Sequence, residues 1–243
     1  MTCLISMLSG LRGGVKNVIT YIVSWRGKPR DEGVVKGSRP FRGKFSYFKI
    51  LPSPLFLFSI TGPVVWIIGD SIVFWAHRRA KNTGEADLGL GTSVRWLGKR
   101  GLRIEGVSDW LDKMGRSEPK PSVVVLHVGT NDIEALSKKK LASLTYRLFD
   151  ANKGKFQIVW SDILERVWYP AGCTGDQGKL DLKRRAANRY AKALAARFHG
   201  KAIPHPSISH NDISLYRTDG LHLADEGLDR FISELKVGLS YLR

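Results

Sequence analysis

The 243-residue sequence contains little cysteine and none of the short motifs typical of a metal site. Its two cysteines, Cys3 and Cys173, are too few to build a disulfide framework. Neither a CxxC pair nor an HExxH run occurs, so we expect no metal and no cofactor. The low cysteine content is compatible with a reducing compartment and slightly favours an intracellular location.

The chain also lacks a clean secretory signal and an uninterrupted apolar stretch of membrane-spanning length. The apolar run at residues 3–8 is short, and Arg12 follows it closely. Residues 50–68 carry no charge, but three prolines interrupt them. We therefore expect no membrane helix there, and the second half of this stretch favours a buried strand.

Positive charge is the most unusual feature of the composition. The chain has 39 Lys and Arg against 22 Asp and Glu, a net charge of +17, and residues 1–49 alone carry +8. Such an excess predicts attraction to a polyanion, which can be nucleic acid, an anionic membrane or an acidic substrate. Residues 1–61 are rich in glycine and basic residues without sustained periodicity, so they are predicted to be a poorly ordered extension and the polyanion contact.

Residues 62–243 have the pattern of one folded domain, which we expect to fold without the extension. Strands are predicted at residues 64–68, 93–97, 123–128, 156–160 and 201–203, and helices at 72–81, 138–151, 179–199 and from 225 onward. The alternation predicts a three-layer α/β domain with a parallel sheet. The apolar stripe predicted for the helix at 179–199 comprises Ala187, Tyr190, Ala191, Leu194 and Phe198, and the last helix is predicted to include Leu239 and Leu242.

Three short segments carry residue types suited to catalysis. The first predicted strand ends in Gly-Asp-Ser at residues 69–71, the central one in Gly-Thr-Asn-Asp at 129–132, and a later loop reads Asp-Gly-Leu-His at 219–222. In open α/β sheets, functional groups gather at the carboxyl ends of strands. We therefore expect these segments to meet.

A serine, a histidine and an aspartate among these residues predict nucleophilic catalysis. A serine hydroxyl needs a base to take its proton, and Ser71 and His222 provide that pair. Asp219 lies three residues before His222, a spacing that places both side chains on one side of a turn. Attack on an acyl carbon also creates an oxyanion, for which the candidate donors are the N–H of Ser71, the N–H of a loop glycine and the Asn131 amide.

Four blocks together resemble a known superfamily. Residues 69–71, a glycine in the loop after the second strand, residues 129–132 and residues 219–222 are similar, in order and spacing, to the four blocks of the SGNH (GDSL-type) hydrolases. The resemblance covers roughly residues 64–242. It implies a flavodoxin-like fold and metal-free hydrolysis of ester, thioester or acetyl groups, with Ser71, the loop glycine and Asn131 lining the oxyanion hole.

The second block is the least regular of the four. Three glycines lie in this region: Gly98, Gly101 and Gly106. Gly101 is favoured because the pair Arg100-Gly101 resembles the family's common Asn-Arg-Gly run. Asp70 and Gly129 are assigned supporting positions in the first and third blocks. Residues 75–80, 159–164 and 219–223 are also similar to esterase-like domains encoded beside or within retroelements.

Plainer interpretations stand beside these. Ser71 is also a suitable N-cap, Asn131 a turn residue and His222 a partly buried histidine. At the level of the whole chain, an active esterase acting on a small acyl-ester substrate is favoured by the filled catalytic positions. The alternatives are a nucleic-acid-associated accessory protein of a retroelement, with an idle or secondary hydrolase domain, and a carbohydrate- or lipid-binding protein without turnover.

Overall fold

The computed structural model describes residues 2–8, 18–24, 63–168 and 176–242, the first two ranges by their backbone alone. The chain divides into two units, Met1–Ile60 and Thr61–Arg243. In the first unit, β1 (Thr2–Leu8) and β2 (Val18–Ser24) form an antiparallel pair that the sequence analysis did not include. The rest of the predicted extension, and with it most of the predicted polyanion contact, lies outside the described residues.

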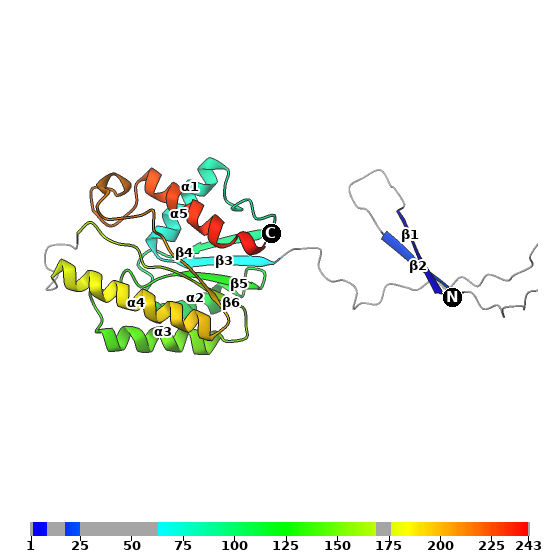
Figure 1. Cartoon of the computed structure of the whole chain (residues 1–243), viewed down its shortest axis with the longest axis horizontal. Coiled ribbons are helices and arrows are strands. Elements are labelled where there is room, and N and C mark those ends of the chain that lie inside the picture. Colours follow the sequence, from blue (N-terminus) through cyan, green and yellow to red (C-terminus); the bar gives the residue numbers. More distant parts are fainter. Residues whose placement is uncertain (1, 9–17, 25–62, 169–175, 243) are drawn as a thin grey trace, which may run out of the picture. The chain divides into compact units, whose positions relative to one another are not determined.

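The second unit is built on one parallel sheet with helices on both faces (Figure 1). The sheet order is β4-β3-β5-β6-β7, from β3 (Val64–Gly69), β4 (Ser93–Gly98), β5 (Val123–His127), β6 (Gln157–Ser161) and β7 (Lys201–Ile203). One face is covered by α1 (Ser71–Thr83) and α5 (Asp225–Gly238), the other by α2 (Val107–Met114), α3 (Lys138–Asn152) and α4 (Gln177–Arg197). The predicted three-layer α/β architecture is confirmed.

Alternation along the central strands divides the core between the two faces of the sheet. In β3, Val65 and Ile67 pack in the cluster that includes α1 and α5, whereas Trp66 and Ile68 pack in the cluster that includes α2, α3 and α4. A strand buried on both faces needs apolar residues at every position, which is why its sequence is a continuous apolar run. The strand order reverses at β3, and such a reversal is where ligands bind in open α/β sheets.

Two predictions about helices were wrong in detail. The eight-residue α2 was not predicted, although Val107, Trp110, Leu111 and Met114 repeat with helical spacing and all pack in the core cluster on that face. The last helix ends at Gly238, so Leu239 and Leu242 lie beyond it and only the latter belongs to the short 3-10 turn Ser240–Leu242. No helix in the described part of the chain is long and apolar enough to cross a membrane.

The buried side of α4 differs from its predicted stripe. Tyr190 is 38% exposed, whereas the polar residues Arg184 and Asn188 are buried. The Asn188 amide donates to the Ile163 carbonyl (3.0 Å) and accepts from the Ile163 N–H (2.9 Å), which offsets the cost of its burial. These bonds fix the segment after β6, whose Val167 N–H donates to the Gly220 carbonyl (2.9 Å) in the loop of the fourth block.

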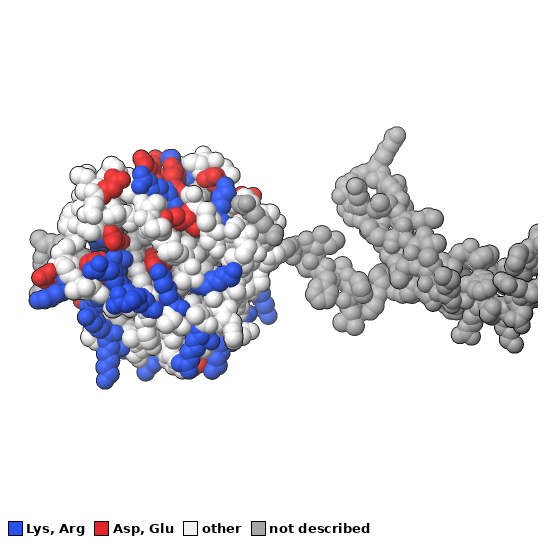
Figure 2. Space-filling model, in the orientation of Figure 1, with Lys and Arg blue, Asp and Glu red and all other residues white. Residues whose placement is uncertain are grey.

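Positive charge is also present on the folded unit. In the face shown in Figure 2, Lys and Arg side chains gather over α3 and α4. The α4 sequence itself carries many basic residues against a single Asp. The attraction for anions predicted from composition is therefore not confined to the first 49 residues.

Candidate active site

The first three blocks emerge side by side because their strands are neighbours. Gly69 at the end of β3 lies opposite Gly98 on β4 and His127 on β5. The turn after β4 is bonded to β3, since the Lys99 N–H donates to the Gly69 carbonyl (2.9 Å). A Cβ on Gly98 would lie 2.4 Å from the Phe74 nitrogen, so a glycine is required for α1 to pack this closely against β4.

Asp70 fixes the start of the helix that carries Ser71. Its carboxylate accepts a hydrogen bond from the Ile72 N–H (2.9 Å) and so caps α1, with Ser71 as the first helical residue. The side chain is almost fully buried, and this burial raises the pKa of Asp70 to about 6, although the Ile72 N–H bond lowers it. The bracing role predicted for Asp70 agrees with this geometry.

The raised pKa of Asp70 predicts a pH-dependent stability. Between about pH 4 and 6 the folded state holds the Asp70 proton more tightly than the unfolded state, so the free energy of unfolding falls as the pH rises. Asp70→Asn removes this titration. The stability of the variant relative to the parent should therefore increase from pH 4 to pH 6, by up to roughly 3 kcal/mol.

Urea unfolding of both proteins at pH 4, 5, 6 and 7 measures this difference. Asp109→Asn, at an exposed carboxylate on α2, is the matched control and should leave the pH dependence of the parent unchanged. Parallel stability curves for the parent and Asp70→Asn would contradict the interpretation.

Ser71, His222 and Asp219 are brought together into one hydrogen-bonded chain. His222 Nε2 lies 3.0 Å from Ser71 Oγ, although the two residues are 151 positions apart, and His222 Nδ1 lies 2.6 Å from Asp219 Oδ2. The other carboxylate oxygen of Asp219 accepts from the N–H groups of Leu221 (2.9 Å) and His222 (2.8 Å). The carboxylate thus holds both the loop and the imidazole ring.

Ionisation of Asp219 determines which nitrogen of His222 carries the proton. Partial burial opposes ionisation, but hydrogen bonds from the side chain and backbone of His222 hold the pKa of Asp219 below its usual value. An ionised carboxylate can only accept hydrogen bonds, so His222 Nδ1 must donate to it. In the neutral ring, Nε2 is then a free acceptor facing the Ser71 hydroxyl, as a general base requires.

Two of the three predicted oxyanion donors, Gly101 and Asn131, lie on loops that are bonded to each other. The Asn131 amide donates to the Leu102 carbonyl (3.1 Å), next to Gly101, and the Asp132 carboxylate accepts from the Ile104 N–H (3.0 Å). Gly101 has a φ of 72°, and no atom lies within 4 Å of the position that a Cβ would occupy. The Cβ position of Gly101 therefore faces open space, and the Gly101 loop lies beside the third block.

The three candidate glycines differ in their surroundings. Gly98 belongs to β4 and packs against α1, and Gly106 caps the start of α2. Gly101 alone of the three lies in the loop directly after the strand. This placement is consistent with the choice of Gly101, and the donor role itself stays a prediction.

Gly129 and a buried arginine support the third block. Gly129 has a φ of 113°, which strains any residue other than glycine, and a Cβ there would also force Ile163 Cδ1, 2.7 Å away, to shift. Arg166 is buried, donates to the Thr130 carbonyl (2.8 Å) and pairs with Glu134 (3.1 Å). Arg166 could not be predicted as part of the site, because an isolated arginine in a loop carries no sign of burial.

A second chain of serine, histidine and carboxylate lies in the interior. Ser161 Oγ is 2.7 Å from His205 Nε2, and His205 Nδ1 is 2.8 Å from Glu234. His127 Nδ1 also contacts Ser161 Oγ (2.9 Å), and burial holds the pKa of His127 well below its usual value. Ser161 has no exposed surface, whereas Ser71 is partly exposed, so only Ser71 is open to a substrate.

Three other residues singled out in the sequence lie outside the chain of Ser71, His222 and Asp219. His77, predicted on a solvated helix face, instead stacks on Trp96 with ring centroids 5.9 Å apart. Trp168 is 44% exposed and packs on Gly220, and Trp75 lines a pocket on α1. Within the described ranges, no group of three or more His, Cys, Asp and Glu side chains is arranged to hold a metal ion.

No protein-family model and no curated protein matches the sequence, but many solved structures share its architecture. A lipolytic protein of the G-D-S-L family from Veillonella parvula matches with a TM-score of 0.57 and 17% identity, over 70% of this chain and 94% of that one. The fold is that of the GDSL-type hydrolases.

Two further structures support this GDSL-type fold. A lipase/acylhydrolase from Enterococcus faecalis matches at a TM-score of 0.56 and 15% identity, over 74% of this chain and 96% of that one. The protein TesA matches at a TM-score of 0.56 and 17% identity, over 74% and 99%. At such identities the likeness concerns the fold, and the chemistry has to be argued from the residues of this chain.

Proposed function

We propose that this protein is a serine esterase that cleaves ester or acetyl groups through Ser71, His222 and Asp219. The observation that carries the proposal is the unbroken hydrogen-bonded chain from Ser71 Oγ through His222 to Asp219, with distances of 3.0 and 2.6 Å. These distances lie within the reach expected between a nucleophile, its base and the group that orients the base. The GDSL-type fold adds support, since the solved structures that share it include acylhydrolases.

In the proposed reaction, Ser71 Oγ attacks the acyl carbon while His222 Nε2 takes the hydroxyl proton. The tetrahedral intermediate collapses as His222 returns that proton to the leaving alcohol, which leaves an acyl group on Ser71. Water then attacks the acyl-enzyme with His222 again as base, and the acid is released. Asp219 stays ionised throughout and stabilises the imidazolium form of His222.

The proposed oxyanion hole consists of the N–H groups of Ser71 and Gly101 and the side-chain amide of Asn131. Asn131 donates one N–H to Leu102, and its amide has a second N–H for the oxyanion. Asn131→Ala should lower kcat by roughly 10² to 10³-fold and change KM much less, because the donor acts mainly in the transition state. Steady-state kinetics on a short 4-nitrophenyl ester measure the split, and a change confined to KM would contradict this role.

Turnover of short-chain 4-nitrophenyl esters by the full chain tests the proposal. We expect hydrolysis that is insensitive to EDTA, since the proposed mechanism uses no metal. Loss of activity on chelation, or absence of turnover from acetate through hexanoate, would count against a serine esterase.

A further inference from the structure

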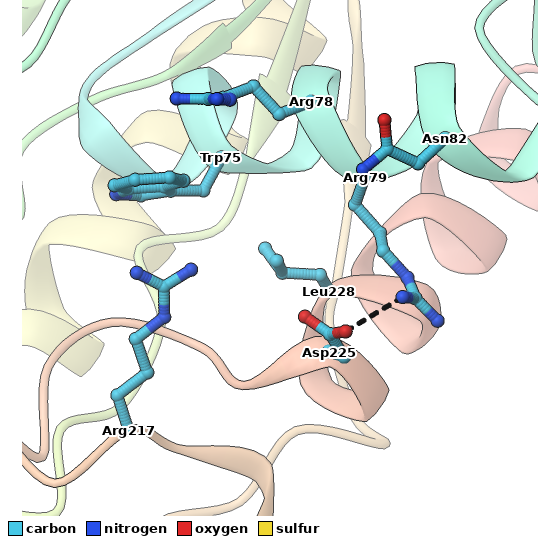
Figure 3. Close-up of a pocket in the computed structure, with 7 residues that line it drawn as sticks. All are labelled: Trp75, Arg78, Arg79, Asn82, Arg217, Asp225 and Leu228. Carbon is cyan, nitrogen blue, oxygen red and sulfur yellow. Dashed lines mark hydrogen bonds and ion pairs between the residues drawn. The ribbon is translucent and has the colours of Figure 1, made fainter.

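A cationic pocket lies one helical turn beyond Ser71 on α1. It has a volume of about 230 Å³ and is lined by Trp75, Arg78, Arg79, Arg217, Asp225 and Leu228, among others (Figure 3). Trp75 is four residues after Ser71, so the two side chains lie on the same side of the helix, about 6 Å apart along its axis. A substrate bound at Ser71 can therefore extend into this pocket.

Arg217 is fixed to the loop that carries His222. Its backbone N–H donates to the His222 carbonyl (2.7 Å), and its side-chain Nε donates to the Leu223 carbonyl (3.1 Å). The guanidinium carbon lies 4.3 Å from the centroid of the Trp75 ring. The side chain is thus held in place by its Nε, and the ends of its guanidinium point toward the Trp75 side of the pocket in Figure 3.

Arg78 provides a second positive charge to the same pocket. Its guanidinium carbon lies 5.4 Å from the Trp75 ring, on the side of the ring away from Arg217 in Figure 3. Within the described residues, neither Arg78 nor Arg217 forms an ion pair with a carboxylate. Two arginines without acidic partners beside a nucleophile are unexpected for a pocket that binds a neutral molecule.

The acidic residue in the pocket is already paired. Arg79 bonds to Asp225 (2.8 Å) and to Asp229 (2.7 Å), so Arg78, Arg79 and Arg217 together face two carboxylates and the group keeps a net charge of +1. A net positive charge is therefore left for a ligand. A planar guanidinium offers several donors matched to phosphate and carboxylate oxygens.

We propose that this pocket binds an anionic group, a phosphate or a carboxylate, carried by the ester that Ser71 cleaves. The inference rests on the proposed esterase function and adds the substrate class: negatively charged esters. Counted along the helix axis from Ser71, Trp75 lies at about 6 Å and Arg78 at about 10 Å, which sets the span between ester and anion.

Two matched pairs of esters test the preference on either side of the ester bond. For the alcohol side, 4-acetoxyphenyl phosphate is compared with 4-methoxyphenyl acetate. For the acyl side, mono-4-nitrophenyl glutarate is compared with 4-nitrophenyl pentanoate. The parent should have the higher kcat/KM for the anionic member of at least one pair, mainly through a lower KM.

Substitution of the two arginines should change that preference. In the pair that shows it, Arg217→Gln should lower the anionic-to-neutral ratio of kcat/KM by roughly tenfold or more, as expected for a lost charged hydrogen bond. Arg78→Gln should lower the ratio in the same direction, and Arg147→Gln, an exposed arginine of α3 on the opposite face, should not. If the parent hydrolyses these esters, no anionic preference in either pair, or an unchanged ratio in both variants, would overturn the proposal.

Binding of phenyl phosphate to the Ser71→Ala protein, measured by calorimetry, separates the two proposals. Binding that weakens tenfold with Arg217→Gln would support the anion site even if no ester were hydrolysed. In that case the esterase function would be rejected and the anion site retained. Turnover of neutral esters without an anionic preference or phenyl phosphate binding would leave the esterase standing and reject the anion site.

Discussion

Replacing Ser71 with alanine should lower kcat for ester hydrolysis by on the order of 10³-fold or more, because the acyl-enzyme can no longer form. Ser71 Oγ is the atom that faces His222 Nε2 at 3.0 Å. The fold should be retained, since the capping bond of α1 comes from Asp70 and the Ser71 hydroxyl has no part in it. Steady-state kinetics on a short ester, together with circular dichroism, give both readouts.

Ser161→Ala is the matched control for this variant. Ser161 makes the same pattern of contacts, to His205 and through it to Glu234, but it is fully buried. Its loss should destabilise the fold by about 1–3 kcal/mol, because His127 and His205 lose a buried partner, while the folded protein keeps its turnover. A Ser71→Ala protein with the turnover of the parent would contradict the assignment.

Replacing His222 with alanine should have an effect of similar size, on the order of 10³-fold or more on kcat. The variant leaves the Ser71 hydroxyl without a base, and added imidazole should restore part of the activity by entering the space left by the ring. His210→Ala is the control, since His210 pairs with Glu165 (2.7 Å) on the surface, in contact with no serine nucleophile. Equal losses in the two variants would indicate a general effect of removing a paired histidine.

Much of this architecture could be predicted from the sequence because the central strands are buried on both faces. The sequences of such strands are continuous apolar runs. The blocks that follow them lie at the carboxyl ends of the strands, where functional groups gather in an open α/β sheet. Ser71 and His222 were predictable as partners because each belongs to a block with its own local geometry. The α1 cap and the loop held by the Asp219 carboxylate both follow from short-range hydrogen bonds.

What could not be predicted depends on burial of polar groups through tertiary contacts. Arg184 and Asn188 have the composition of a solvated helix face, yet they are buried because they bond to the backbone after β6. Ser161 and His205 come together only through the pairing of β6 with β7 and the chain beyond. Arg217 is an ordinary basic loop residue in sequence, and its place beside Trp75 comes from the packing of its loop against α1.

The central claim is that Ser71 is the nucleophile, and labelling with a fluorophosphonate tests it most directly. The 243-residue chain is treated with the probe, digested, and analysed by mass spectrometry to find the modified serine. We expect one adduct, on Ser71, that is absent from Ser71→Ala and forms more slowly in His222→Ala. An adduct on Ser161, or labelling of Ser71→Ala at the rate of the parent, would contradict it.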